Sequence, residues 1–280
     1  MERKIGIVVD STTKTNFKET LFNDASVVDL SILVDGEEYI DGTLTNAQVL
    51  DFIAQKKKVT TSQPSPEKFA RGYEEQFELG YESIICITIS KGLSGTINSA
   101  HLAAQSFADK KIVVIDSMTV GPGVEILLEE AYKLINAGLS LEEVVAGINK
   151  KANEITLFLS IEQLAVLVAG GRLSKLQAMI GNILKVKPIL QFKQGVLSVF
   201  KKVRGIDAIY EFIADQVKEL FDKAGSALGK IAYVGNEEKA VFLKELIAKK
   251  VKQAQVTISG AISPVVATHL GYDGLGIVIV

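Results

Sequence analysis

The sequence predicts an α/β fold in two domains. Short β-branched runs alternate with amphipathic segments through the first half, which is typical of a mainly parallel sheet with helices on both faces. The second half begins with a hairpin pattern and then returns to alternation, which indicates an α/β domain with a mixed sheet. A length of 280 residues suits two domains, and we expect them at 1–157 and 158–280.

Local signals indicate the elements of the first half. Ile5–Val9 is a short apolar run typical of a buried strand. Asn46 is a candidate helix cap, and Ser65 followed by Pro66 marks a helix start. The expected elements are, in order, a strand over 5–9, a helix over 46–55, a turn at 60–64, a helix over 65–79, a strand over 83–89, a helix over 94–107, a strand over 111–115, and helices over 122–137 and 141–152.

The second half is organised around a predicted hairpin. Two apolar runs flank Gln194-Gly195, a pair that suits a tight turn less well than Asn-Gly does. Helical and strand patterns then alternate to the last residue. The expected elements are strands over 155–159, 188–191 and 196–203, a helix over 206–223, a strand over 230–234, a helix over 237–250, and strands over 255–260 and 277–280.

Composition excludes several classes of protein. The chain has 31 basic and 33 acidic residues, so the molecule as a whole is not a general nucleic-acid binder. Cys86 is the single cysteine and histidine occurs twice, which leaves no material for a disulfide framework or a Cys-based zinc site. The sequence shows neither a signal peptide nor a membrane-spanning run. We therefore expect a cytoplasmic protein with no metal and no cofactor.

The chain is apolar for one without a membrane span. Hydrophobic residues make up 48% and the mean hydropathy is +0.26. Aromatic residues are only 7%, so aliphatic side chains must supply most of the core volume. Either a large, well-buried core or an additional apolar cavity or interface explains this composition.

Three hydroxyl-rich segments lie beside the ends of predicted strands. In Gly92–Thr96 a strand leads through a glycine-rich turn into a helix, so backbone N–H groups and the helix dipole favour an anion beside Ser94. Thr60–Ser62 and Ser11–Thr13 fall at the same edge of the sheet, where ligands of open α/β sheets bind. Taken singly, each cluster is also typical of helix capping or turn chemistry. Together they predict an uncharged, hydrogen-bonding anion site.

One of the two histidines lies in a setting that favours a ligand. His269 stands in segment 267–274, whose glycines allow close approach of the backbone to a ligand. A lone histidine is also often a satisfied core or surface residue, and this interpretation stays open. His101 lies inside a predicted helix, where we assign it a structural role.

The basic residues gather in one stretch. Between Glu162 and Asp207 there are eight Lys or Arg residues and no acidic one, a local charge of +8. Such a stretch is either a solvated face or a surface that attracts an acidic or phosphorylated partner. Nucleic acid is a third interpretation, weakened because only Phe192 and Phe200 interleave the charges.

A serine esterase is the alternative enzyme interpretation. Gly92–Thr96 is similar to the G-x-S-x-G nucleophile elbow in its strand–turn–helix context, with threonine in place of the last glycine. Ser94 would be the nucleophile and His269 the base, with Asp116 or Asp207 as the acid. The sequence contains no G-x-G-x-x-G, P-loop or H-E-x-x-H motif, so dinucleotide, P-loop and zinc-protease functions have no motif support.

Five segments of the sequence form a recognisable set: Val9–Thr12, Thr61–Ser65, Gly92–Thr96, Gly170–Ser174 and the loop that contains His269. Taken together, they resemble the DegV family of bacterial fatty-acid-binding proteins, the acyl-binding subunits of fatty acid kinase. The resemblance covers essentially the whole chain, in the same order.

The resemblance implies a two-domain DegV-like fold with a long-chain fatty acid buried between the domains. The chain would then be a lipid carrier without catalytic residues of its own. By resemblance, the fatty-acid carboxylate is bound by Thr61, Ser94 and His269. The residues that support this site would be Ser62, Gly95 and Thr96.

The resemblance also implies a fatty acid kinase as partner, which brings ATP and magnesium and makes acyl-phosphate for phospholipid synthesis. Arg172 and Arg204 match basic docking positions of the family, and Lys201 and Lys202 stand beside them in the basic stretch. An acyltransferase and transient contact with a membrane surface are further expected interactions. The sequence departs from the family pattern at Tyr272-Asp273 and over 121–125, which bears on the shape of the head-group end of the site. The chain length, unsaturation and branching of the ligand stay open, because they depend on pocket-lining residues that only the fold places.

Overall fold

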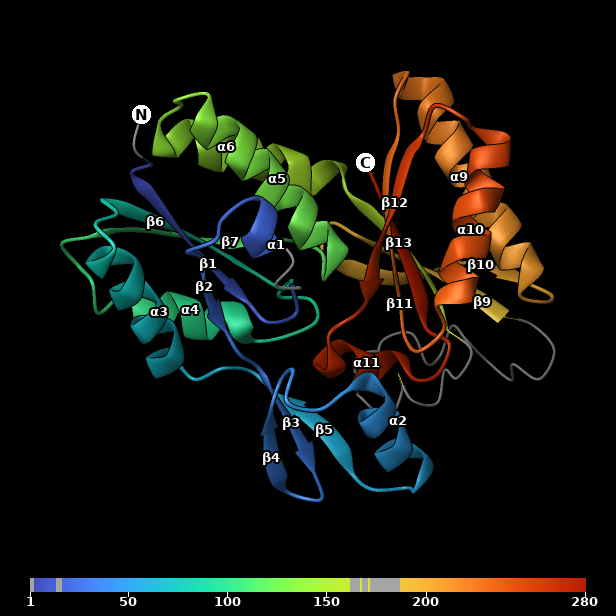
Figure 1. Cartoon of the computed structure of the whole chain (residues 1–280), viewed down its shortest axis with the longest axis horizontal. Helices are drawn as coiled ribbons and strands as arrows, with labels where there is room; N and C mark the ends of the chain where they lie inside the picture. Colours follow the sequence, from blue (N-terminus) through green and yellow to red (C-terminus); the bar gives the residue numbers. More distant parts are fainter. Residues whose placement is uncertain (1–2, 14–16, 162–166, 168–170, 172–186) are drawn as a thin grey trace.

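The computed structural model describes residues 3–13, 17–161, 167, 171 and 187–280, and it contains three sheets (Figure 1). The first, sheet A, has the strand order β2-β1-β6-β7, and all of its neighbouring strands are parallel. This confirms the parallel sheet predicted for the first half. Its strands are β1 (Ile5–Asp10), β2 (Ser26–Val28), β6 (Ser83–Thr88) and β7 (Lys111–Asp116).

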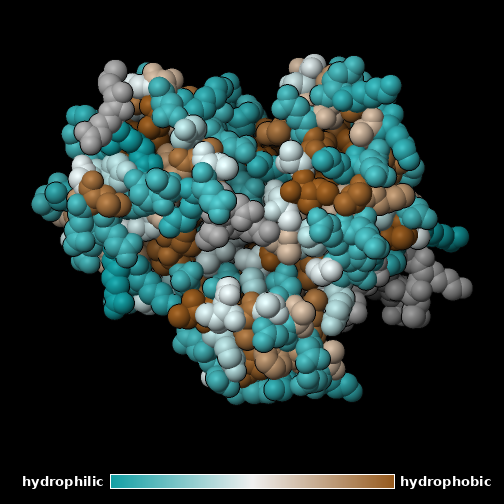
Figure 2. All heavy atoms as spheres, in the orientation of Figure 1, coloured by the Kyte–Doolittle hydropathy of each residue, from teal (hydrophilic) through white to brown (hydrophobic). Residues whose placement is uncertain are grey.

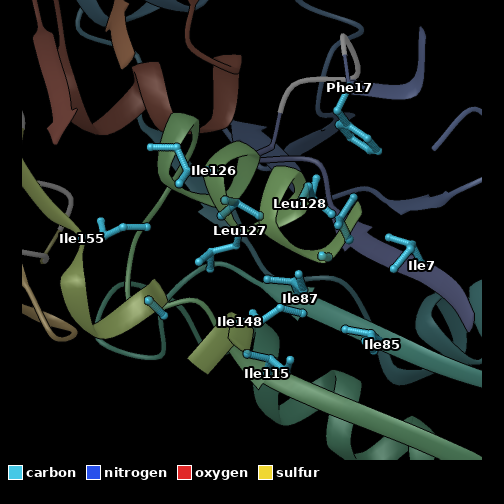
Figure 3. Close-up of a cluster of buried hydrophobic side chains, with 14 of the residues drawn as sticks. Ile7, Phe17, Ile85, Ile87, Ile115, Ile126, Leu127, Leu128, Ile148 and Ile155 are labelled. Carbon is cyan, nitrogen blue, oxygen red and sulfur yellow. The ribbon is translucent and has the colours of Figure 1, made fainter. Parts of the chain in front are cut away.

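Helices cover both faces of sheet A, as the alternation of buried side chains requires. One face packs against α3 (Pro66–Glu78) and α4 (Thr96–Ala104), and the other against α5 (Pro122–Asn136) and α6 (Leu141–Glu154). Figure 3 shows the second of these layers, in which side chains of the strands lie against α5 and α6. The core residues there are aliphatic, among them Ile7, Ile85, Ile87, Leu127 and Ile148.

Sheet C is mixed and has the order β10-β9-β8-β13-β11-β12, in which only β11 and β12 pair in parallel. Helices α9 (Asp207–Ala224) and α10 (Glu237–Lys250) pack against one of its faces (Figure 1). The mixed sheet predicted for the second half is therefore confirmed. The strands are β8 (Thr156–Ser160), β9 (Lys187–Lys193), β10 (Val196–Val203), β11 (Leu228–Tyr233), β12 (Gln255–Ala261) and β13 (Leu275–Ile279).

The predicted hairpin is formed by β9 and β10, with Gln194 and Gly195 as its two-residue turn. Both turn residues have positive φ angles, 49° and 75°, as a type I′ turn demands. The predicted limit between the domains, at residues 157 and 158, lies within β8. Core residues from both halves pack in one cluster around α5, and the domain limits stay a prediction.

A third sheet was not foreseen from the sequence. Sheet B has the antiparallel order β4-β3-β5 and packs against α2 (Asn46–Ala54) and α11 (Pro264–Leu270). The prediction of a turn over 60–64 was wrong, because β5 (Val59–Ser62) pairs with β3 (Ser31–Val34) along its full length. Threonine-rich segments suit strands as well as turns, since Thr is β-branched. The remaining elements of this region are β4 (Glu37–Ile40) and the single-turn helix α1 (Phe17–Thr20).

Two helix starts differ from the prediction by one or two residues. Helix α2 is capped by Thr45 rather than Asn46, in a reciprocal capping box with Gln48. Helix α4 begins at Thr96 after an N-cap at Gly95, so Ser94 lies in the turn before it. The start predicted at Ser65 and Pro66 is confirmed.

The face of the molecule seen in Figure 2 is predominantly hydrophilic, with hydrophobic side chains in scattered groups. Within the part of the chain that the structure describes, no helix is both long enough and apolar enough to cross a membrane. Many of the aliphatic side chains are instead buried in the clusters between the layers.

Candidate functional site

A cavity lies where the three sheets meet. Sheet C forms one wall, with the face that is not covered by α9 and α10. The opposite walls come from sheet B, α11 and the turns that follow β6 and β7. The apolar lining residues are Leu30, Ile89, Leu93, Val120, Pro122, Leu157, Leu159, Leu167, Phe192, Leu197, Ala232, Ile262, Val265, Val266, Leu270 and Gly276.

Three polar residues complete the described lining, and they are the three that the resemblance assigned to a carboxylate: Thr61, Ser94 and His269. They come from β5, from the turn between β6 and α4, and from the last turn of α11. The Thr61 Oγ1 and His269 Nε2 atoms lie 2.9 Å apart in a hydrogen bond. The fold thus brings together side chains that are 208 positions apart in the sequence.

Ser94 is held in its turn by short-range hydrogen bonds. Its backbone N–H donates to the carbonyl of Ser90 at 3.1 Å, and its Oγ accepts from the backbone N–H of Thr96 at 3.3 Å. The Ser94 and Thr96 hydroxyls are 2.8 Å apart. Ser94 is half-buried while Thr96 is fully buried, so Ser94 is the hydroxyl of this pair that faces the cavity.

A glutamine connects the Thr61 strand to the Ser94 turn. The Gln63 side chain lies directly over Gly95, where a Cβ atom would overlap its Oε1. Its Nε2 donates to Ser99 Oγ of α4 at 2.9 Å. A side chain at position 95 would displace the Gln63 amide, which in this structure connects the end of β5 to the start of α4. By contrast, Ser62 is exposed and does not line the cavity.

The β9–β10 hairpin packs onto the same turn. A Cβ atom at Gly92 would overlap the backbone oxygen of Gly195, so the two glycines let the backbones meet. Phe192 and Leu197, which flank the hairpin turn, belong to the cavity wall. The position of this wall therefore depends on the contact between Gly92 and Gly195.

Asp41 was missed by the sequence analysis, although it positions α11. Its Oδ1 accepts from the backbone N–H of Val265 at 3.0 Å, and its Oδ2 accepts from Ser11 Oγ at 2.8 Å. Burial raises the pKa of the Asp41 carboxyl. No local pattern around residue 41 distinguishes it from a surface aspartate at the end of a strand. The helix that Asp41 holds, α11, carries His269.

The hydroxyl cluster at 11–13 is used inside the fold and does not line the cavity. Ser11 bonds to Asp41, while the backbone N–H and the hydroxyl of Thr12 donate to the buried carboxylate of Asp10. The backbone N–H of Ile89 donates to the other oxygen of Asp10. Nothing in the lining of the cavity supports the prediction that this third cluster joins the anion site, and the Ser11 and Thr12 hydroxyls are already bound to Asp41 and Asp10.

Asp10 gives the fold a pH dependence that can be measured. Complete burial raises its pKa from 3.8 to about 6, although hydrogen bonds from Thr12 and Ile89 oppose the shift. The native state then holds this proton more tightly than the unfolded state. We expect its stabilising contribution, about 3 kcal/mol, to be complete below pH 3.8 and to be lost as the pH rises through 6.

Chemical denaturation of the wild type and of Asp10→Asn between pH 4 and 7 tests this expectation, since other titrating groups cancel in the difference. The free energy of unfolding of the wild type should fall relative to that of the variant as the pH rises. Parallel curves would show that Asp10 does not titrate in this range.

The predicted docking residues lie on the edge strand of sheet C and just after it. Lys201, Lys202 and Arg204 are all exposed, and the Lys201 ammonium lies 5.1 Å from the centre of the Phe212 ring. Arg172 lies outside the described residues. Three of the four predicted basic side chains thus share one exposed region of β10 and the loop that follows it.

The arrangement of the side chains also bears on two other functions, a metal site and a serine esterase. In the described residues no group of three or more His, Cys, Asp or Glu side chains is arranged to hold a metal ion. A serine esterase requires its histidine to contact the nucleophile. Here the Nε2 of His269 bonds to Thr61, and the Ser94 hydroxyl bonds to Thr96, which does not favour the esterase.

Comparison with known proteins agrees with this architecture. The model of the family described as "Uncharacterised protein, DegV family" matches residues 4–280. A DegV domain-containing protein of Staphylococcus aureus is 31% identical over 277 residues, which is 98% of this chain and 97% of the relative.

Two solved structures share the whole fold. A DegV family protein from Thermus thermophilus, described by its fatty acid binding, has a TM-score of 0.88 and 30% identity, with 99% of each chain covered. The Fatty Acid Kinase (Fak) B3 protein of Streptococcus pneumoniae, loaded with linoleic acid, has a TM-score of 0.84 and 28% identity, with 98% of each chain covered. The chain belongs to the DegV family.

Proposed function

We propose that this protein binds a long-chain fatty acid, with the alkyl chain in the cavity and the carboxylate at Thr61, Ser94 and His269. The observation that carries the proposal is the lining: every described lining residue except these three is apolar. The three lie near one another, because Thr61 bonds to His269 while Gln63 reaches from the same strand to the glycine beside Ser94. An amphipathic acid with one polar end matches this distribution.

The energetics agree with such a ligand. Burial of alkyl groups contributes about 0.8 kcal/mol per methylene, so ~15 methylenes contribute roughly 12 kcal/mol before the costs of association. A carboxylate left unpaired in an apolar cavity would offset much of that gain. The two hydroxyls and the imidazole that line the cavity would supply hydrogen bonds to the carboxylate.

The protein would act as a carrier, and a separate fatty acid kinase would carry out the chemistry. A carboxylate oxygen of the bound acid attacks the terminal phosphorus of ATP, which forms acyl-phosphate and releases ADP. The kinase supplies ATP and magnesium, and the product feeds phospholipid synthesis. The likeness to a protein described as part of fatty acid kinase supports this role.

Analysis of the ligand in the purified protein tests the proposal directly. The protein is isolated without added lipid, denatured and extracted, and the extract is analysed by mass spectrometry. We expect one fatty acid per chain, released only on denaturation. Protein that is free of lipid and takes up no fatty acid on incubation would contradict the proposal. Labelling of Ser94 by a fluorophosphonate together with ester turnover would instead support the esterase.

Kinase docking is expected to depend on the exposed basic residues of sheet C. Reversal of Lys201, Lys202 and Arg204 to glutamate should lower the rate of kinase-coupled acyl-phosphate formation at least tenfold, because like charges at an interface repel. Fatty acid affinity should stay unchanged, since these side chains point into solvent. Lys249→Glu, an exposed reversal on α10, is the matched control. A loss of fatty acid affinity with kinase coupling intact would show that the two surfaces are misassigned.

A further inference from the structure

Gly276 occupies a position in β13 where the pattern of the strand calls for a large side chain. Leu275, Ile277 and Ile279 point to the α9–α10 face of sheet C and are buried there. Val278 points to the opposite face, in the core that surrounds α5. Because successive side chains alternate between faces, position 276 shares the face of Val278, which is the face of the cavity.

The backbone does not require glycine at this position. Gly276 lies in a regular part of the ladder, paired with Leu159 on β8 and Ala232 on β11. It is not among the residues with a positive φ angle. Glycine in the interior of a strand weakens the strand and commonly marks a place where another group comes close to the backbone. The glycine therefore serves a need for space rather than a need for an unusual conformation.

The space above Gly276 belongs to the cavity. A Cβ atom built there would lie 2.9 Å from Leu159 Cδ2 and 3.2 Å from Leu157 Cδ1. Both leucines line the cavity, as do Gly276 itself and its neighbour Ala232. A methyl group at position 276 would thus press on Leu159 and Leu157, so these two side chains of the cavity wall would have to shift.

We infer that Gly276 is a specificity-determining residue, which sets the cross-section of the alkyl chain that the cavity admits. The inference rests on the proposed function. The alkyl chain of the bound acid passes over the bare backbone of β13, in contact with Gly276. A side chain at this position selects against acids that are widened or bent where they cross the strand, while it leaves the hydrogen bonds to the carboxylate unchanged.

The experiment compares Gly276→Ala and Gly276→Val with the matched variant Gly229→Ala. Gly229 also lies inside a strand of sheet C without a positive φ, and its Cβ atom would meet Val256 at 3.1 Å, but it does not line the cavity. Dissociation constants are measured for the wild type and the three variants by displacement of a fluorescent fatty acid. The ligands are straight saturated, cis-monounsaturated and methyl-branched acids of equal carbon number.

We expect Gly276→Ala to change the ratio of affinities between two of these acids by at least about tenfold, the selectivity that one methylene confers in an apolar pocket, and Gly276→Val to change it further. Gly229→Ala should keep the wild-type ratios. Equal changes for all three acids, or no change, would overturn the inference even though the wild type binds fatty acid. A wild type that binds none of the acids would overturn the proposed function itself. Thermal unfolding of each variant confirms that it is folded.

Discussion

Ser94→Ala is expected to lower the affinity for a long-chain fatty acid about 10- to 100-fold. The cavity around Ser94 is almost entirely apolar, so a carboxylate oxygen that loses the Ser94 hydroxyl finds few replacements. An unsatisfied buried group of this kind costs about 1–3 kcal/mol, and more when it is charged. Because the side chain is small and half-buried, the stability of the fold should change little.

Ligand displacement with one defined fatty acid measures this effect, with Thr61→Val as a second removal of a hydroxyl at nearly constant shape. The matched control is Ser106→Ala, which removes an exposed hydroxyl just beyond the far end of α4. If Ser94→Ala binds as the wild type does and supports kinase coupling at the wild-type rate, the carboxylate lies elsewhere in the cavity. The proposal that the cavity holds the alkyl chain would then remain, but the site assigned to the carboxylate would be wrong.

Gly92→Ala is expected to have the largest effect on stability. The new Cβ atom would overlap the backbone oxygen of Gly195, and backbone atoms at a type I′ turn cannot move aside as the end of a side chain can. Overpacking of this kind costs about 3 kcal/mol. The hairpin must shift, and with it Phe192 and Leu197 of the cavity wall.

Thermal and chemical unfolding measure the loss, which corresponds to a decrease in Tm of roughly 6 °C or more. Fatty acid affinity should fall in the same variant, because the wall of the cavity moves with the hairpin. Lys91→Ala is the control in the same turn. It removes the exposed Lys91 ammonium, whose ion pair with Asp116 is long at 3.6 Å, so the stability should change little. Wild-type stability of Gly92→Ala would mean that the hairpin does not rest on this turn.

The regular elements of the fold were accessible from sequence because each has a local signal. The strand β1 is a β-branched run, and α3 begins with Ser65 and Pro66. Sheet B lacked such signals. Each of its three strands is only four residues long, and β5 is rich in hydroxyl residues that suit turns equally well. Helix α11 has only seven residues, which is too short for its periodicity to be recognised.

In the candidate site, too, some residues have a local sequence signal and others have none. Ser94 and Thr61 were found because each lies in a hydroxyl-rich segment next to a helix start, and His269 because glycines surround it. Gln63 and Asp41 hold these groups in place, but no pattern in their local sequence predicts this role. Their roles arise from contacts with Gly95 and Val265, which depend on how separate elements pack.

The sequence by itself determined most strands of sheets A and C with the helices that cover them, the richness in aliphatic side chains, and which hydroxyl groups stand at the ends of these elements. These properties follow from periodicity and composition, which act over a few residues. Only the tertiary structure decided that Thr61 meets His269 and that Gly276 faces a cavity. Such contacts join residues that are far apart along the chain, so they are set by the packing of whole layers and not by any local pattern.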